Sequence, residues 1–436
     1  MTGYNKGLIS FLDESPTAFH AVASIKKKLV ANGYSELAES EKWELTECGK
    51  YFVTRNDSSI IAFRVPRFNF TSFMISAAHS DSPAFKVKEN PEIVENGYVK
   101  LNVEGYGGML MAPWLDRPLS VAGRIIVKNG NKYEVRLVNV DRGLLLIPNV
   151  AIHMNRDANK GQTWNAQVDM LPVLGSADEA KGSFMRIIAE SAGVSDSDII
   201  SHDLFLYVRD KGKVWGGSEE YISAPHLDDL QCVYGCLEGF LGANNSSSVP
   251  VLAVFDNEET GSLTKQGADS TFLEDVLKRI SLSCSKDEEG YYRAVSSSFM
   301  VSADNAHALH PNHPEKADPV NRPAINKGIV IKFNAAQHYT TDAVSCAVYR
   351  DLCESNDIPV QVFTNRSDSR GGSTLGNVSN AHVSLNTVDI GLAQLAMHSC
   401  YETAGAKDTK HLIDAMTIFY SKTFRVGAGG SFELLD

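Results

Sequence analysis

The feature that most constrains this chain is a series of short, nearly uninterrupted apolar runs that alternate with longer segments of helical periodicity. Three of these runs are "FMISAAH" at 73–79, "VPVLAVF" at 249–255 and "SSFMVSA" at 297–303. A strand that is apolar on both faces fits the interior of a sheet that helices cover on both sides. Alternation of such strands with helices favours parallel connections. The chain therefore predicts an α/β fold with a mostly parallel sheet covered by helices.

The stretch from 88 to 220 has a different pattern, in which polar and apolar residues alternate. Its segment "LSVAGRIIVKNGNKYEVRLVNV" has the period of strands with one solvent-facing side, and Asn129-Gly130 is a typical hairpin turn. We therefore expect residues 88–220 to form a β-rich domain. It is inserted into an α/β domain that consists of residues 1–87 and 221–436.

Helix signals mark both ends of the chain. Two helices are expected in the first forty residues, with Ser15-Pro16 at the start of the second and Gly33 after its end. A last long helix is expected from Ser399 to about Tyr420, with Ser399 and Glu402 as its capping box.

The composition excludes several classes of partner. A formal net charge of −12 argues against non-specific binding to nucleic acid or to an anionic membrane. The chain contains neither a signal-peptide pattern at its start nor the roughly 18 uninterrupted apolar residues of a membrane span. Its seven cysteines are odd in number, scattered and free of CxxC pairs, which indicates a reduced, cytoplasmic protein.

Each of the three apolar runs ends in side chains that can bind a metal. His79 closes the first run, Glu258 and Glu259 follow the second, and Asp304 follows the third. Ligands of open α/β sheets bind beyond the carboxyl ends of the strands, so we expect these side chains to meet at one edge. An unpaired charge at the end of a buried strand is costly, which favours a metal over chance placement.

Two further residues are positioned where such a site can recruit them. Asp228 in "APHLDDL" lies just before or at the start of a helix, and His398 in "LAMHS" precedes the expected last helix. Singly, these residue types have ordinary explanations, because glutamate pairs often form solvated turns and aspartate pairs often cap helices. The repeated placement at strand ends favours a carboxylate-rich metal site.

The residue types suit two metal ions that share one ligand. His79 and Asp304 could hold one ion, Glu259 and His398 a second, and Asp228 could bridge them with its two oxygens. Mixed imidazole and carboxylate ligation fits zinc, with manganese or cobalt as alternatives. Two ions that share a bridge polarise a carbonyl and activate a water molecule.

Two acidic neighbours of these ligands suit other roles. Asp81, two residues after His79, is placed to accept the second ring N–H of that histidine and so to orient it. Glu258 is placed to take the proton of the attacking water as general base. Adjacent glutamates can do both tasks only if the backbone turns between them, which Gly261 allows.

Over nearly its whole length, the chain also resembles the aspartyl aminopeptidase family of two-metal exopeptidases. The resemblance is carried by motifs in the family's order: "FLDESPTAFHAV", "AAHSDSP", "WLDRPLSVAGR", "IPNVAIHMNR", "APHLDDL", "DNEETGS", "SADNAHALHPNH", "GGSTLG" and "QLAMHS". It implies a zinc-aminopeptidase α/β fold, an inserted dimerisation domain, the five ligands above with Asp228 bridging, and Glu258 as general base. Asp229 departs from the family pattern, in which asparagine is usual at this position.

The resemblance further implies a substrate pocket. His153 resembles a histidine that such enzymes lend across a dimer to a neighbouring active site. Lys332 and Tyr339 match positions that line the pocket for the first side chain of the substrate, and Gly372 belongs to a glycine loop that borders the site. Without the resemblance, these residues would be a strand histidine, an edge charge, a packed aromatic and a turn. The family forms homo-oligomers, which are tetrahedral dodecamers built from dimers.

We therefore predict a metallo-aminopeptidase that uses two zinc ions per subunit to hydrolyse Asp and Glu from the free N-termini of peptides. Lys332 and His153 from a neighbouring subunit would supply the positive pocket that an acidic substrate needs. Two alternatives stay open, which are an aminopeptidase of the same fold with a neutral preference and a catalytically idle assembly protein. A deacylase or carboxypeptidase on the same metal scaffold is a further alternative.

Overall fold

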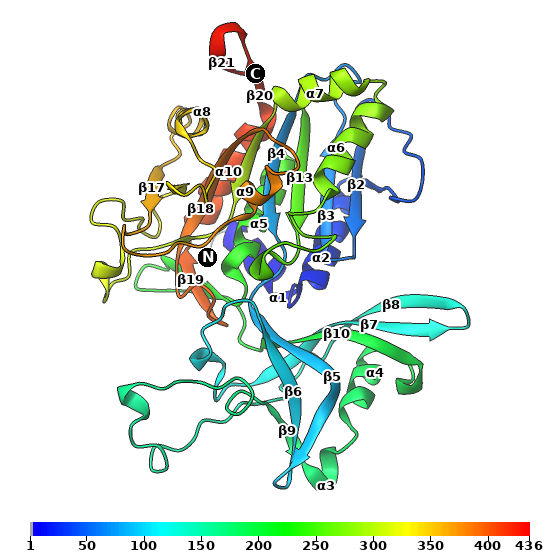
Figure 1. The fold of residues 1–436 in the computed structure, drawn as a ribbon, viewed down its shortest axis with the longest axis vertical. Helices are drawn as coiled ribbons and strands as arrows, with labels where there is room; N and C mark the ends of the chain where they lie inside the picture. The colour runs from blue at the N-terminus through cyan, green and yellow to red at the C-terminus, as the bar shows by residue number, and fades with distance from the viewer. Residues whose placement is uncertain (1–2) are drawn as a thin grey trace.

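The computed structural model describes residues 3–436, and four parallel strands form the centre of its large sheet. β13 (Val249–Phe255), β4 (Phe73–His79), β14 (Phe299–Ala303) and β18 (Asn386–Leu395) lie side by side in this order (Figure 1). Every residue of β13, β4 and β14 is buried, which confirms the strands predicted from the apolar runs. Because neighbouring parallel strands end at the same edge, Phe255 at the end of β13 pairs with His79 at the end of β4.

Antiparallel pairings flank this parallel centre, so the sheet as a whole is mixed. Within residues 3–436 it has thirteen strands, and β3, which pairs with β13, and β19 and β16, which both pair with β18, run antiparallel to these neighbours. The predicted α/β fold is confirmed, but the sheet is mixed rather than mostly parallel: outside the centre, β1 with β2, β15 with β18 and β16 with β17 also pair in parallel, and the other pairs are antiparallel. The remaining strands are β1 (Ser35–Glu36), β2 (Lys50–Arg55), β3 (Ser59–Arg64), β11 (Lys213–Trp215), β12 (Tyr221–Ala224), β15 (Ala306–His307), β16 (Ile329–Phe333), β17 (Val360–Thr364) and β19 (Glu402–Gly405).

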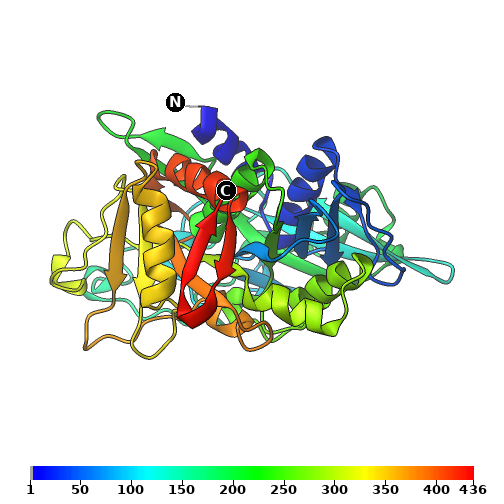
Figure 2. The same cartoon turned by 90° about the horizontal axis from the view of Figure 1, so that it is seen from above.

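Helices cover both faces of the large sheet (Figures 1 and 2). In β4, Met74 packs into one hydrophobic cluster and Ile75 into the other, as the period of two in a strand requires. The helices of the Met74 face are α1 (Gly3–Asp13), α2 (Ala18–Ala31), α5 (Leu227–Gly242), α8 (Ala343–Glu354) and α10 (Asp408–Ser421). Those of the Ile75 face are α6 (Phe272–Ser283), α7 (Glu288–Ser296) and α9 (Leu375–Ser379).

A second sheet lies below the first in Figure 1 and is antiparallel throughout. Its order is β8-β7-β10-β5-β6-β9, with its own core around Trp114 and the helix α4 (Phe184–Ala192). The β7–β8 hairpin is confirmed, and its two-residue loop, Gly130-Asn131, lies one residue later than the predicted Asn129-Gly130 turn. The strands are β5 (Ala84–Glu95), β6 (Tyr98–Tyr106), β7 (Leu119–Asn129), β8 (Lys132–Asn139), β9 (Val173–Ser176) and β10 (Ile199–Val208).

The strands of this second sheet fall within 84–208, whereas β11 and β12 pair with the large sheet. The division of the chain into a domain of 88–220 and a domain of 1–87 and 221–436 stays a prediction.

The predicted start of the last helix is wrong. The helix α10 begins at Asp408, and residues 402–405 form the strand β19. His398 therefore lies in the turn between β18 and β19. The physical reason is that the Glu402 side chain accepts hydrogen bonds from the backbone N–H groups of Asp228 and His398 instead of capping a helix. The two predicted N-terminal helices are confirmed as α1 and α2.

The chain ends in a hairpin of β20 (Thr423–Val426) and β21 (Phe432–Leu435), which projects from the end of the molecule opposite the second sheet (Figure 1). Among residues 3–436, no helix has the length and apolar character needed to cross a membrane.

The close packing of α5 against α10 depends on a glycine. A Cβ atom at Gly239 would lie 2.5 Å from Met416 Cβ and 2.9 Å from the Met416 carbonyl carbon. Although Gly→Ala inside a helix gains up to about 1 kcal/mol in propensity, we expect Gly239→Ala to lower the free energy of unfolding by about 1–3 kcal/mol. Urea unfolding measures this change. Gly242→Ala is the control, because the nearest atom there is 3.5 Å away. Unchanged or increased stability of Gly239→Ala would contradict the prediction.

Candidate metal centre

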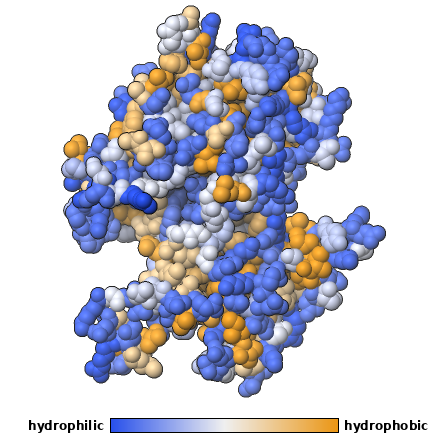
Figure 3. All heavy atoms as spheres, in the orientation of Figure 1, coloured by the Kyte–Doolittle hydropathy of each residue, from blue (hydrophilic) through white to orange (hydrophobic). Residues whose placement is uncertain are grey.

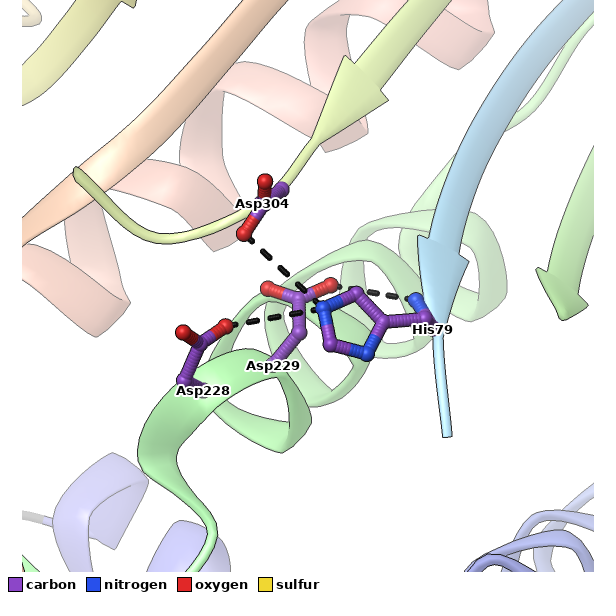
Figure 4. Close-up of side chains that lie close together, drawn as sticks. All are labelled: His79, Asp228, Asp229 and Asp304. Atoms are coloured by element: carbon purple, nitrogen blue, oxygen red, sulfur yellow. Dashed lines mark hydrogen bonds and ion pairs between the residues drawn. The ribbon is translucent and has the colours of Figure 1, made fainter. Parts of the chain in front are cut away.

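Three chain segments that are distant in sequence bring His79, Asp228 and Asp304 together. His79 is the last residue of β4, Asp304 follows β14, and Asp228 is in the first turn of α5 (Figure 4). His79 Nε2 lies 3.5 Å from Asp228 Oδ1 and 3.9 Å from Asp304 Oδ1. Asp229 approaches the same place, and its Oδ2 accepts a hydrogen bond from the His79 backbone N–H at 3.1 Å.

A second group shares Asp228 with the first. His398 Nε2 lies 3.6 Å from Asp228 Oδ2 and 3.4 Å from Glu259 Oε2. The two carboxylate oxygens of Asp228 thus face two different histidines. This arrangement fits a carboxylate that bridges two ions, and each group has three or more ligand atoms within 4.8 Å of one another.

A tight turn separates the neighbouring glutamates. Asn257 and Gly261 both have left-handed backbone conformations, with φ of 62° and 97°, and Glu258–Thr260 form a single 3-10 turn between them. Glycine adopts this conformation without steric cost, so Gly261 permits the turn that the sequence suggested. Glu259 consequently faces His398, while Glu258 lines the cavity beside it.

The donor set fits zinc. Among the residues that the structure describes, Asp228 Oδ1, Asp229 Oδ1 and Glu259 Oε1 are buried without a hydrogen-bond partner. Buried carboxylate oxygens without partners are costly unless a cation compensates them. Imidazole nitrogens and carboxylate oxygens are ordinary zinc ligands, and the predicted set contains both types.

Hydrogen bonds to the other ring nitrogens leave Nε2 of both histidines free for a metal. The Asp81 carbonyl oxygen is 3.1 Å from His79 Nδ1, and the Asp81 Oδ1 atom is 3.4 Å from it. The main-chain oxygen of Asp81 therefore helps to orient the His79 ring, in addition to the carboxylate that the sequence suggested. His398 Nδ1 donates to the Gly108 carbonyl oxygen at 2.6 Å.

The concentration of carboxylates shifts the pKa values of this cluster. Burial, together with the charges of Asp304, Asp81 and Asp228, raises the pKa of Glu258 to about 8. Burial and nearby carboxylates also raise the pKa of Glu259 and of Asp229.

For two members of the cluster, neighbouring charges shift the pKa against the effect of burial. Burial alone would lower the pKa of His79, but its contacts with Asp228, Asp304 and Asp81 raise it. Burial alone would raise the pKa of Asp304, but the Lys332 ammonium and the His79 ring lower it.

A cavity of about 340 Å³ opens beside the cluster. Lys332, Tyr339 and Gly372 line it, so the structure brings the three predicted pocket residues to the predicted ligands. Lys332 is buried, and its ammonium donates to Asp304 Oδ2 at 3.2 Å and to the Asn305 carbonyl at 3.0 Å. His153 does not line this cavity; it is exposed in the segment between β8 and β9 of the second sheet.

Sequence reasoning missed several residues at this site. Glu402 holds the backbone at Asp228 and His398, and Tyr106 donates from the second sheet to Asp81. Glu402 lies four residues after His398, but its spacing from Ser399 indicated a helix cap instead. Tyr106 lies 25 residues from Asp81, so no local signal identifies its role. The wall of the cavity also includes His307, Phe363 and Met397. His307 lies within the motif "SADNAHALHPNH", three residues after Asp304, and this closeness in the chain was the signal that could place it near the site.

The chain is similar to metallo-aminopeptidases in sequence. Residues 11–420 match the family described as "Aminopeptidase I zinc metalloprotease (M18)". A Clostridium acetobutylicum protein named "Probable M18 family aminopeptidase 2" is 49% identical over 427 residues, which are 96% of this chain and 98% of that protein.

The fold is also similar to solved structures. A chain in the "Cryo-EM structure of the Ape4 and Nbr1 complex" has a TM-score of 0.92 and 33% identity, covering 96% of this chain and 85% of that one. The S. cerevisiae mApe1 dodecamer has a TM-score of 0.84 and 27% identity, covering 96% of both chains. The similarity spans both sheets, since it covers nearly the whole chain.

We expect zinc to bind more tightly as pH rises from about 5.5 to 8. The pKa values of two proposed ligands, Glu259 and His79, are raised, so protons compete with zinc at these residues until the pH rises past those values. Zinc binding requires deprotonated ligands and therefore releases protons. The zinc-dependent rise in Tm should be larger at about pH 8 than at about pH 5.5, and calorimetry in two buffers should detect proton release. A larger rise at the lower pH would contradict this expectation.

Proposed function

The chain belongs to the aminopeptidase I zinc metalloprotease family (M18), and from this premise we propose that it removes N-terminal Asp and Glu residues from peptides with two zinc ions per subunit. As a member of this family it is a zinc-dependent aminopeptidase and a hydrolase. The acidic preference rests chiefly on one observation, the buried Lys332 ammonium in the wall of the cavity beside the carboxylate cluster.

The proposed zinc ligands divide into two pairs and a shared residue. His79 and Asp304 would hold one ion, Glu259 and His398 the other, and Asp228 both. The division is supported by the distances of 3.5 and 3.6 Å from the two Asp228 oxygens to the two histidines. Zinc, when bound, would polarise the scissile carbonyl and acidify the attacking water.

Glu258 is the proposed general base. It lines the cavity, lies next to Glu259 in the chain, and its carboxyl group is not needed for the ligand set. Its carboxylate would take the proton of the attacking water and return it to the leaving amine as the peptide bond breaks. A pKa raised by burial towards neutral pH suits a group that must both accept and donate a proton. Asp81 would support this step, because its carboxylate oxygens accept the backbone N–H groups of Glu258 and Glu259.

Recognition of the substrate's first side chain is proposed to involve Lys332 and Tyr339 of one subunit and His153 of a neighbour. The Lys332 ammonium lies 5.3 Å from the centroid of the Tyr339 ring, so the two side chains share one wall. Gly372 would border the substrate without a side chain to obstruct it. A carboxylate beside a buried ammonium forms a charge-assisted hydrogen bond, which is stronger than a neutral one.

The contribution of His153 requires a second copy of the chain. We propose a homo-oligomer in which the domain at 88–220 forms dimers and dimers form a tetrahedral dodecamer. The similar S. cerevisiae mApe1 structure is described as a dodecamer. Apolar side chains are exposed over the second sheet and its loops (Figure 3), among them Tyr133, Val135, Leu137, Ile152 and Met154. An apolar surface of this kind is typical of subunit contacts. The proposed cytoplasmic location rests on seven free cysteines.

One observation favours a second candidate, an aminopeptidase with a neutral preference. Lys332 already pairs with Asp304 at 3.2 Å, so its charge is partly used within the protein. A lysine that only compensates Asp304 would leave the substrate pocket without a positive group of its own.

A panel of peptides that differ only in the first residue tests the proposal. With the zinc-loaded enzyme, kcat/KM should be highest for Asp and Glu, lower for Leu and Lys, and zero for N-acetyl-Asp, because the proposed site would require a free amine. Glu258→Gln should reduce kcat by about 100-fold or more with unchanged zinc content, and it serves as the control for contaminating peptidases. Equal rates for Leu and Asp would support the neutral candidate. The absence of turnover with zinc, manganese or cobalt would refute an active peptidase.

Removal of the Lys332 charge tests acid selectivity separately. We expect Lys332→Met to reduce kcat/KM for an Asp peptide by about 10–100-fold more than for a Leu peptide, because a hydrogen bond to a charged group contributes about 1.5–3 kcal/mol. Lys327→Met, at an exposed lysine just before the same strand β16, is the matched control. Equal losses for both peptides, together with weaker zinc binding, would mean that Lys332 acts only through Asp304.

A further inference from the structure

A short segment of the second sheet, Tyr106-Gly107-Gly108 at the end of β6, contacts groups around both proposed zinc positions. Tyr106 contacts Asp81, Gly107 lies against Glu259, and Gly108 contacts His398. The rest of the candidate centre is built on strand ends and loops of the large sheet and on the first turn of α5. Through this segment, the second sheet therefore contacts the candidate metal centre.

The Asp81 carboxylate lies between these two parts of the molecule. Its Oδ1 accepts the Glu258 N–H at 3.1 Å and its Oδ2 accepts the Glu259 N–H at 3.2 Å. The Tyr106 hydroxyl donates to the same Oδ2 at 2.7 Å. One short carboxylate thus fixes the turn that carries the proposed base and a proposed ligand, and Tyr106 supplies its third hydrogen bond.

The direction of the Tyr106 hydroxyl proton is fixed by a further contact. The Asn257 side-chain amide donates to the Tyr106 oxygen at 2.8 Å, so the hydroxyl proton is directed to Asp81. The ring itself packs edge-on against Phe205 of β10, with centroids 5.5 Å apart at 83°. A phenylalanine at 106 would keep this packing and lose only the hydrogen bonds.

The two glycines after Tyr106 contact Glu259 and His398, the proposed ligands of the second zinc ion. The Gly108 carbonyl accepts His398 Nδ1–H, and the Leu110 N–H donates to the His398 carbonyl at 3.0 Å. Gly107 has a left-handed φ of 74°, and a Cβ there would lie 3.1 Å from Glu259 Cβ. Only a residue without a side chain fits between this strand end and that proposed ligand without displacing it.

We propose that Tyr106 is a positioning residue of the metal centre, through which the second sheet holds Asp81 and thereby the turn of Glu258 and Glu259. The inference rests on the proposed function. Hydrogen bonds behind metal ligands typically contribute 10- to 100-fold to metal affinity or activity. The placement of the second sheet would then set how well the large sheet binds zinc.

The test compares Tyr106→Phe with Tyr207→Phe in the full-length protein. Tyr207 also lies in the second sheet and its hydroxyl donates to Asn139 at 2.7 Å, away from the metal centre. Zinc affinity is measured by competition with a chromophoric chelator, and kcat and KM are measured on the Asp peptide. Tyr106→Phe should bind zinc about 10–100-fold more weakly and lower kcat in the same range. KM should stay within about threefold, because the hydroxyl lies behind Asp81 and not in the substrate cavity.

A second pair of variants keeps the inference testable if the phenylalanine variant folds poorly. Gly107→Ala should weaken zinc binding, whereas Gly105→Ala, two residues earlier and within β6, should not, because a Cβ there meets only Met109 at 3.5 Å.

The outcomes separate this inference from the proposed function. Zinc affinity and kcat of Tyr106→Phe within twofold of the wild type would overturn the inference, as would an equal loss in Tyr207→Phe. If the wild type bound zinc but cleaved none of the peptides, the proposed function would fail. The zinc affinities of the variants would still decide whether Tyr106 positions the site.

Discussion

Repulsion among buried carboxylates is the constraint on which the rest of this structure depends. Asp228, Asp229, Glu258, Glu259 and Asp304 converge at one edge of the large sheet with two histidines and a single buried lysine. The raised pKa values of Asp229, Glu258 and Glu259 express the cost of holding these charges together in a low dielectric, whereas the Lys332 ammonium and the His79 ring lower the pKa of Asp304. A bound cation offsets this repulsion, so the geometry that brings the carboxylates together also gives this edge its affinity for zinc.

The layers around this edge keep the carboxylates in place despite that cost. The parallel strands end at the same edge because they run in one direction in register, and helices bury them on both faces. Glu402 binds the backbone of two proposed ligands, Asp81 binds the turn of two others, and Tyr106 reaches Asp81 from the second sheet. The second sheet is thus joined to the metal centre by hydrogen bonds as well as by the chain connection.

Much of this arrangement could be predicted from the sequence, and the reason is local. Apolar runs that end in His79, Glu258 and Asp304 identify both the strands and the polar ends that meet at one edge. The glycine at 261 indicates the turn that separates the two glutamates. The last helix was predicted nine residues too early. Ser399 and Glu402 have the spacing of a capping box, but the Glu402 side chain binds the backbone N–H groups of His398, four residues before it, and of the distant Asp228.

The sequence by itself determined the strands, most helices, the set of metal-capable residues and their association with a known family of enzymes. These features depend on residues that are close together in the chain or on short contiguous motifs. Only the tertiary structure decided that Asp228 presents its two oxygens to two histidines, that Lys332 pairs with Asp304, and that Tyr106 supports Asp81. Those facts depend on how segments that are far apart in the chain pack against one another, from Asp81 and Tyr106, 25 residues apart, to Asp228 and His398, which are 398 − 228 = 170 residues apart. No local pattern encodes that packing.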